Sequence, residues 1–128
     1  MLLMKQGFSL TQRLRSFRYA LAGLRTLLRT QHNAWIHAAA TVAVIGAGGY
    51  FALSATEWLW LVLAMTLVWT AEAFNTALEL LADAVTREQH PLIGQAKDVA
   101  AGAVLISALG ALLIGVLVLG PHVLQRLG

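Results

Sequence analysis

The chain has 128 residues, of which 59% are hydrophobic and only 12% are charged, and its mean hydropathy is +0.72. Soluble domains have about 25% charged residues, so this composition predicts one integral-membrane domain spanning residues 1–128. The absence of cysteine excludes disulfides, thiolate metal sites and cysteine nucleophiles, and a net charge of +3 is too small and dispersed to favour nucleic acid as a partner.

The N-terminal part of the chain is predicted to form an amphipathic helix over about residues 9–31. It follows a start that lacks the apolar core and cleavage site of a signal peptide, so we expect the N-terminus to be retained. Apolar side chains recur at helical spacings of three and four, at Leu10, Leu14, Phe17, Leu21, Leu24 and Leu28. Arginines project about 60° to 140° from this stripe, at about 100° per residue, namely Arg15, Arg18, Arg25 and Arg29. This pattern favours a helix on an anionic membrane surface; the alternative is a soluble helix packed on a core.

Three apolar stretches follow, at about residues 34–53, 57–85 and 92–120, and each is long enough to span a membrane. The second is about 43 Å long as a helix, so we expect it to project beyond the hydrocarbon. For the third we expect Pro91 in the first turn and Pro121 as the end of the helix. Small residues line this last span, which favours close helix packing and an oligomer.

The basic residues predict the orientation in the membrane. Six of them precede the first span, namely Lys5, Arg13, Arg15, Arg18, Arg25 and Arg29. Arg87 and Lys97 lie between the second and third spans, Arg126 is in the C-terminal tail, and the loop 54–56 has none. The positive-inside rule therefore places the N-terminus and the 86–97 loop in the cytoplasm and the C-terminus outside.

The second span carries an unusual acidic face. Glu72, Asn75, Glu79 and Asp83 lie within about 80° of one another on a helix. Burying an ionised group costs several kcal/mol, so charged side chains inside a membrane span usually have a function. Paired carboxylates at a membrane boundary can ligate magnesium or act as a general base. The alternative is a solvated polar face, which explains Asp83 well but explains poorly the deeper Glu72 and Asn75, close to Trp69.

Lys97 and Asp98 stand at the start of the third spanning helix. A lysine beside a helix N-terminus favours phosphate, although a simple positive-inside anchor is the alternative. His90 alone is an ordinary loop residue. The sequence has no Walker-type glycine loop and no protein-kinase signature, so any nucleotide site in it is of a different kind.

The stretch "EAFNTALELLADAVTREQHPLIGQAKDVAAGAVL", residues 72–105, resembles the signature of the small bacterial diacylglycerol kinase and undecaprenol kinase family. "NAWIHAA" (33–39) and "SFRYALAGLR" (16–25) are also similar to it. The resemblance implies a homotrimeric all-α bundle of three-span subunits with an amphipathic N-terminal helix. It further implies transfer of phosphate from ATP, with Mg²⁺, to a lipid hydroxyl at the cytoplasmic face of the bacterial inner membrane.

The same resemblance implies roles for individual residues. Glu72 resembles the general base for the lipid alcohol, with Trp69 on the lipid-substrate side, and Asn75 resembles a residue that arranges the site. Glu79 resembles the carboxylate that ligates magnesium on the nucleotide phosphates. Further nucleotide-site residues are implied at Lys97, Asp98, Tyr19, His90 and Gly94.

Two departures from the family pattern concern the surface helix. Gln31 stands where the family commonly has a second metal-ligating glutamate, and its amide can offer an oxygen to magnesium but no charge. Trp35 stands where arginine is common. The leading interpretation is a lipid kinase acting on diacylglycerol or undecaprenol, with residues 90–105 closer to the undecaprenol kinase branch. The alternatives are a non-enzymatic membrane protein with a cation-binding acidic stripe and a kinase homologue weakened by Gln31.

Overall fold

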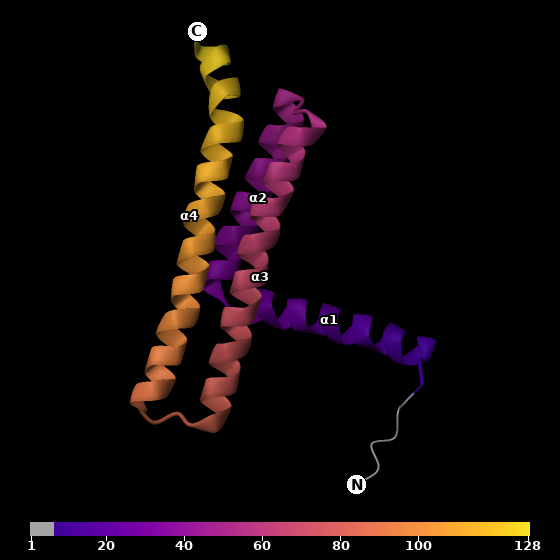
Figure 1. Cartoon of the computed structure of the whole chain (residues 1–128), viewed down its shortest axis with the longest axis vertical. Coiled ribbons are helices and arrows are strands. Elements are labelled where there is room, and N and C mark those ends of the chain that lie inside the picture. The colour runs from indigo at the N-terminus through magenta and orange to yellow at the C-terminus, as the bar shows by residue number, and fades with distance from the viewer. Residues whose placement is uncertain (1–6) are drawn as a thin grey trace.

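The computed structural model describes residues 7–128, and over these residues it is entirely helical. The helices are α1 (Leu10–Thr30), α2 (His32–Phe51), α3 (Ala55–Val85) and α4 (Pro91–Leu127). Three long helices run along a common direction, and α1 crosses them at a steep angle near the start of α2 (Figure 1). The predicted all-α class with three spans is confirmed, because α2, α3 and α4 are each long and apolar enough to cross a membrane. Lys5, which contributes to the predicted orientation, lies outside the described residues.

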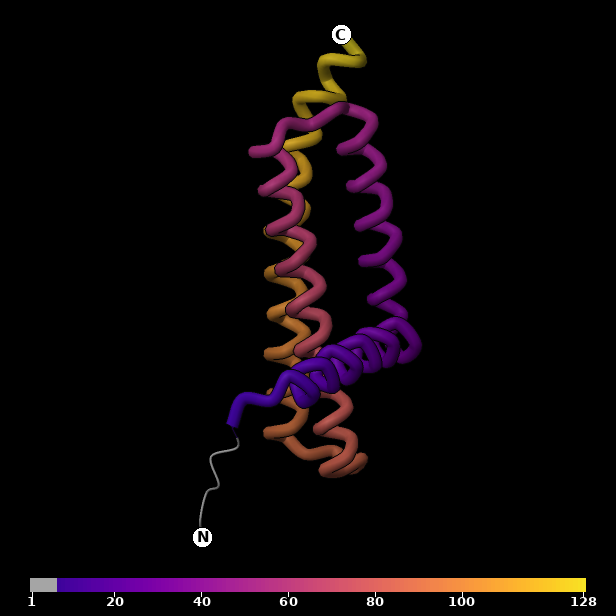
Figure 2. Tube along the Cα trace, turned by 90° about the vertical axis from the view of Figure 1, so that its right-hand side faces the viewer, coloured from indigo at the N-terminus to yellow at the C-terminus, as the bar shows by residue number. Residues whose placement is uncertain are grey.

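A single extended residue separates α1 from α2. Gln31 has φ −119° and ψ 118°, and it serves both as the C-cap of α1 and as the N-cap of α2. Because one extended residue breaks the helix, the chain turns sharply there, and α1 leaves the bundle sideways (Figures 1 and 2). At the other end of α1, the Ser9 hydroxyl accepts a hydrogen bond from the Gln12 backbone N–H at 3.4 Å.

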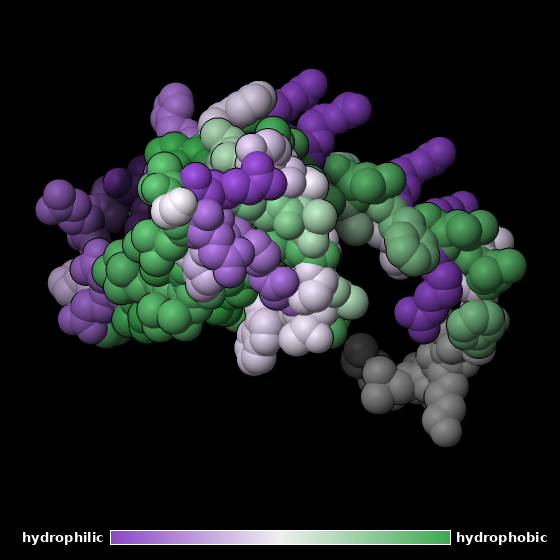
Figure 3. Space-filling model, turned by 90° about the horizontal axis from the view of Figure 1, so that it is seen from above, coloured by the Kyte–Doolittle hydropathy of each residue, from purple (hydrophilic) through white to green (hydrophobic). Residues whose placement is uncertain are grey.

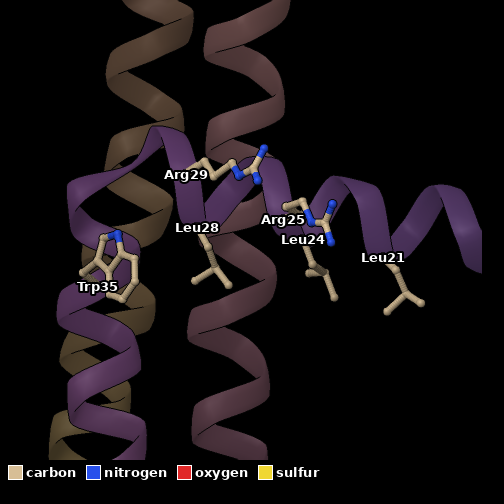
Figure 4. Close-up of a pocket in the computed structure, with 6 residues that line it drawn as sticks. All are labelled: Leu21, Leu24, Arg25, Leu28, Arg29 and Trp35. Atoms are coloured by element: carbon tan, nitrogen blue, oxygen red, sulfur yellow. The ribbon is translucent and has the colours of Figure 1, made fainter.

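The leucines and the arginines of α1 point to different sides of the helix (Figure 4). Leu21, Leu24 and Leu28 point to the side toward which α2 runs, while Arg25 and Arg29 stay nearer the level of the helix (Figure 4). Seen along the bundle, α1 shows hydrophobic side chains flanked by hydrophilic ones (Figure 3). Its apolar stripe is exposed, from 37% at Leu28 to 70% at Phe17, and α1 is anchored to the bundle by the buried Leu27.

A short connection joins α2 to α3. Ser54 and Glu57 form a capping box, in which the Ser54 hydroxyl accepts from the Glu57 N–H and the Glu57 carboxylate accepts from the Ser54 N–H, both at 3.2 Å. This reciprocal pair satisfies two free backbone donors. As a consequence α3 begins at Ala55.

The helices α3 and α4 form a hairpin and lie side by side in both views (Figures 1 and 2). Pro91 occupies the first turn of α4, as its fixed φ predicts. The expectation that Pro121 ends this helix is wrong, because α4 continues through it to Leu127. The preceding Gly120 has no Cβ to meet the proline ring, which weakens the usual steric reason for a break. Beyond the proline, His122 and Arg126 contact Glu57 and Tyr50 of the neighbouring helices.

The buried core of the chain is small and lies where α1, α2 and α3 meet and along α3. Its hydrophobic members are Leu27, Ala34, Leu53, Leu61, Ala64 and Val68. No residue of α4 is buried. Large apolar side chains cover the outside of the helices, which suits a hydrocarbon surrounding and makes this an integral membrane protein.

Candidate active site

The predicted acidic face of α3 exists, and its burial changes steadily along the helix. Glu72 is completely buried and Asn75 is 7% exposed, Glu79 is half-buried, and the Asp83 side chain is 55% exposed. The face therefore runs from the interior of the chain to its surface within three turns. Solvation of a polar helix face accounts for Asp83 but not for the two buried members, and burying polar groups without partners is costly.

Gln31 meets this face at the end of α1. Its side-chain amide Nε2 donates to Glu79 Oε2 at 3.3 Å, and Asn75 Nδ2 donates to Glu79 Oε1 over a longer 3.5 Å. The sharp turn at Gln31 places the side chain over α3, so residues 48 positions apart in sequence are joined. Gln31, Asn75 and Glu79 thus form one polar cluster.

Glu72 lies one to two turns deeper and has a different environment. Neither of its carboxylate oxygens has a hydrogen-bond partner among the described residues, and the same is true of Asn75 Oδ1. His37 Nε2 of α2 is 3.3 Å from Glu72 Oε2, within ion-pair distance but without hydrogen-bond geometry. Thr76, next to Glu72 on α3, is also buried, and its hydroxyl donates to the Glu72 carbonyl at 2.9 Å.

Trp69 flanks this pair. Its indole Nε1–H donates to Thr41 Oγ1 of α2 at 3.0 Å, and its ring meets the His37 ring edge-on, with 6.3 Å between the centroids. The Thr41 hydroxyl in turn donates to the His37 carbonyl at 2.7 Å. The lipid-side residue predicted from sequence therefore lies beside Glu72 and ties α3 to α2.

Lys97 extends the acidic face to α4. Its ammonium group is 2.7 Å from Asp83 Oδ1, across the hairpin between α3 and α4, with both side chains partly exposed. Of the other predicted nucleotide-site residues, His90 caps α4 by accepting from the Leu92 N–H at 3.2 Å. Asp98 and Gly94 are exposed on the first turns of α4, and a Cβ on Gly94 meets nothing within 4 Å.

Tyr19 is not brought to this cluster. It is 71% exposed on α1, and no side-chain hydrogen bond or ring contact joins it to the other described residues. The single chain thus gathers Gln31, Glu72, Asn75 and Glu79, connects Lys97 to the exposed end, and leaves Tyr19 apart.

The residues present suit magnesium rather than a metal that prefers nitrogen or sulfur. No group of three or more His, Asp and Glu side chains suited to a metal ion occurs within residues 7–128. Magnesium usually takes only one or two protein carboxylates and completes its shell with water and substrate phosphates. Glu79, the carbonyl oxygen of Gln31 and the unpaired Asn75 Oδ1 are oxygen donors of that kind.

Sequence reasoning missed His37 and Thr41. Both lie in a span without Lys, Arg, Asp or Glu, so the absence of full charges directed attention away from them. The available signal was the spacing of Ala34, His37 and Thr41, which puts two polar side chains and one small one on a single helix face inside a membrane span. Ala34 is fully buried there.

An open groove lies under α1, with a volume of about 590 Å³ (Figure 4). Leucines and arginines of α1 and an aromatic ring of α2 line it: Leu21, Leu24, Arg25, Leu28, Arg29 and Trp35. Trp35 thus stands at the α1–α2 corner, where it is 64% exposed at the edge of the groove.

Comparison with known proteins identifies the family. The family model for prokaryotic diacylglycerol kinase matches residues 18–119. An undecaprenol kinase of Bacillus subtilis (strain 168) is 39% identical over 107 residues, covering 84% of this chain and 87% of the relative. A diacylglycerol kinase of Synechocystis sp. (strain ATCC 27184 / PCC 6803 / Kazusa) is 44% identical over 111 residues, covering 86% of this chain and 63% of that longer relative. The chain therefore belongs to the prokaryotic diacylglycerol kinase family and is an integral-membrane lipid kinase.

Proposed function

We propose that the chain transfers the γ-phosphate of ATP to the hydroxyl group of a membrane lipid, either diacylglycerol or undecaprenol. The observation that carries this proposal is Glu72, a fully buried carboxylate with no hydrogen-bond partner among the described residues, on the same helix face as the half-buried Glu79. A buried carboxylate without donors is a good proton acceptor, since a hydroxyl that approaches it relieves its unsatisfied state.

In this reaction Glu72 takes the proton of the lipid hydroxyl as the lipid oxygen forms a bond to the γ-phosphorus. The bond from that phosphorus to the bridging oxygen of ATP breaks, and ADP leaves with the electron pair. Glu79, with Gln31 and Asn75 around it, would hold the magnesium ion that accompanies the nucleotide, and the ion would neutralise charge on the phosphates. Lys97 changes partner from Asp83 to a phosphate oxygen when the nucleotide binds.

The arrangement suits substrates of opposite solubility. The buried end of the acidic face takes the lipid alcohol, and its exposed end takes the nucleotide, within one helix. The chain then lies in the bacterial inner membrane with its N-terminus and this exposed end in the cytoplasm and its C-terminus outside, following the distribution of basic residues. Because Leu21, Leu24 and Leu28 point to the side toward which the spanning helix α2 runs (Figure 4), α1 then lies in the cytoplasmic interface with these leucines facing the hydrocarbon.

A homotrimer forms part of the proposal. No residue of α4 is buried within one chain, and small side chains line the helix, so both features favour packing against other copies of the chain. Nucleotide-site residues that stand apart in one subunit, such as Tyr19, then have a second subunit available to them.

The test is a phosphorylation assay on the purified full chain in lipid, with MgATP and either diacylglycerol or undecaprenol. We expect labelled phosphate in one lipid at a rate clearly above the other. The similarity to both an undecaprenol kinase and a diacylglycerol kinase makes these the two lipids to compare. Absence of transfer to both contradicts the proposal, and equal rates contradict a specific choice.

The alternative of a non-enzymatic protein with a cation-binding acidic stripe gives a different result. Nucleotide binding stabilises a kinase by mass action, so MgATP raises its melting temperature. A cation-binding protein responds to magnesium alone in the same way as to MgATP. The ion pair between Lys97 and Asp83 on the same face favours the interpretation as a kinase, because the positive charge of a lysine repels a cation.

A further inference from the structure

His37 of α2 has no role in the proposed reaction, yet it is the side chain that reaches Glu72 from another helix. Its Nε2 is 3.3 Å from Glu72 Oε2, and among the described residues no hydrogen-bond donor satisfies either oxygen of that carboxylate. Burying an ionised carboxylate in this position costs free energy unless a cation or a hydrogen-bond donor pairs with it.

Two side chains of α3 lie against the His37 ring, Glu72 and Trp69. The Trp69 ring meets it edge-on, the Thr41 hydroxyl binds its backbone carbonyl, and Trp69 is itself tied to Thr41. One turn earlier, the fully buried Ala34 lets α2 approach the bundle closely. The Trp69 indole therefore holds the imidazole beside the buried carboxylate, and Thr41 links that indole to the helix turn that carries His37.

Access differs between the two partners. The Glu72 side chain is completely buried, whereas the His37 side chain is 16% exposed. The imidazole is thus the partly exposed group beside the buried carboxylate, and its nitrogen can accept a proton that Glu72 has taken from a lipid alcohol.

We propose that His37 is a positioning and proton-relay residue for Glu72. After the lipid hydroxyl has given its proton to Glu72, that proton passes from the Glu72 carboxyl to His37 Nε2 and from the imidazolium to water. Glu72 is then a carboxylate again and His37 is neutral. The balance over one turnover is one lipid O–H bond broken, one lipid O–P bond formed, one P–O bond of ATP broken and one proton released. This inference rests on the proposed function.

Within residues 7–128, Glu72 of α3 is the titratable side chain in contact with the His37 ring, and its neighbour Trp69 is uncharged. Glu79 lies about two turns further along α3 and is engaged with Gln31 and Asn75. A change in the pH dependence of turnover on removal of His37 therefore reports on the His37–Glu72 pair.

The test compares the wild-type full chain with His37→Gln and His37→Ala. Glutamine keeps a polar side chain of similar reach but cannot carry the proton, so kcat is expected to fall by about tenfold or more while the KM for ATP stays unchanged. The pH–rate profile of His37→Gln is expected to differ in shape from that of the wild type, because the proton carrier is lost. Added imidazole is expected to restore turnover to His37→Ala in a saturable way, because the partly exposed cavity admits it.

A matched control is His122→Gln, which removes a histidine that also faces a glutamate, 2.6 Å from Glu57 at the far end of the bundle. We expect its kcat and pH profile to match the wild type. Melting temperatures of all variants establish that they fold, and rescue by imidazole separates a lost proton carrier from a damaged structure.

The outcomes are distinct. A wild-type chain that phosphorylates neither lipid overturns the proposed function and this inference with it. A wild-type chain that is active, with His37→Gln equal to it in kcat and pH profile, overturns this inference alone. So does a folded and inactive His37→Ala that imidazole does not restore, because His37 then acts only in packing.

Discussion

Glu72 and its neighbour Asn75 contain the polar atoms that the fold buries without hydrogen-bond partners, among the residues described. Elsewhere on the same helix, the buried Thr76 satisfies its hydroxyl on the Glu72 carbonyl. The backbone of α3 can therefore satisfy a buried hydroxyl, whereas the carboxylate of Glu72 and the amide oxygen of Asn75 stay without partners among the described residues. Unsatisfied buried groups in native proteins concentrate where a ligand completes them.

Replacing Glu72 by Gln tests the base assignment. The amide has the same shape but accepts no proton, so we expect lipid phosphorylation to fall by at least about 100-fold. MgATP is expected to raise the melting temperature as in the wild type, because Glu79 and Lys97 are unchanged. The control is Glu88→Gln, which alters an exposed glutamate in the connection between α3 and α4. Full activity of Glu72→Gln contradicts the assignment.

Gln31→Glu tests the departure from the family pattern. The amide of Gln31 now donates to Glu79, and a glutamate there places two carboxylates in contact. Like charges repel unless a cation joins them, so we expect a lower melting temperature without magnesium and a larger stabilisation on adding it. Half-maximal activity is expected at a few-fold lower magnesium concentration, measured by titration. Gln89→Glu, an exposed change of the same charge, is the control; identical magnesium curves for wild type and Gln31→Glu mean that the amide is sufficient.

At the scale of the helices, Gly48 marks a close contact between α2 and α3. A Cβ added to Gly48 collides with the Trp58 ring, whereas a Cβ added to Gly46 or Gly49 meets nothing within 4 Å. The glycine therefore allows the indole of one helix to lie against the backbone of the other, a small-residue contact typical of membrane helices.

Gly48→Ala is expected to destabilise the chain. Overpacking costs about 1–3 kcal/mol, and the gain in helix propensity offsets about 1 kcal/mol of it. Thermal unfolding in detergent measures the difference. Gly46→Ala has the propensity gain without the collision, so it is expected to melt at or above the wild-type temperature. A Gly48→Ala protein as stable as Gly46→Ala shows that Trp58 moves freely.

The helical elements and the polar face of α3 could be predicted from sequence because they depend on local patterns of hydrophobicity and spacing. The continuation of α4 past Pro121 could not, since it involves contacts of His122 and Arg126 with residues far away in sequence. The role of His37 could not be predicted either, because it depends on the contact with Glu72, which lies on another helix. The pairing of Gln31 with Glu79 was expected from the family resemblance, not from any property of the two residues alone.

At the scale of the whole molecule, the orientation in the membrane is open to a direct test because the chain contains no cysteine. Thr56 in the first turn of α3 and Gln89 before α4 are both exposed and lie at opposite ends of the bundle. In Thr56→Cys we expect a membrane-impermeant maleimide to label intact cells. In Gln89→Cys we expect labelling only after the membrane is opened. The reverse pattern contradicts the proposed orientation.

The absence of any buried residue in α4 has a consequence for how much active protein a membrane holds. A helix with no buried residue is held in place mainly by its hairpin partner, yet α4 carries Lys97 and Asp98. If neighbouring copies complete its surroundings, the active fraction depends on how often subunits meet within the bilayer. Specific activity should then fall as the same amount of protein is diluted into more lipid, so that the lipid-to-protein ratio itself acts as a control on the enzyme.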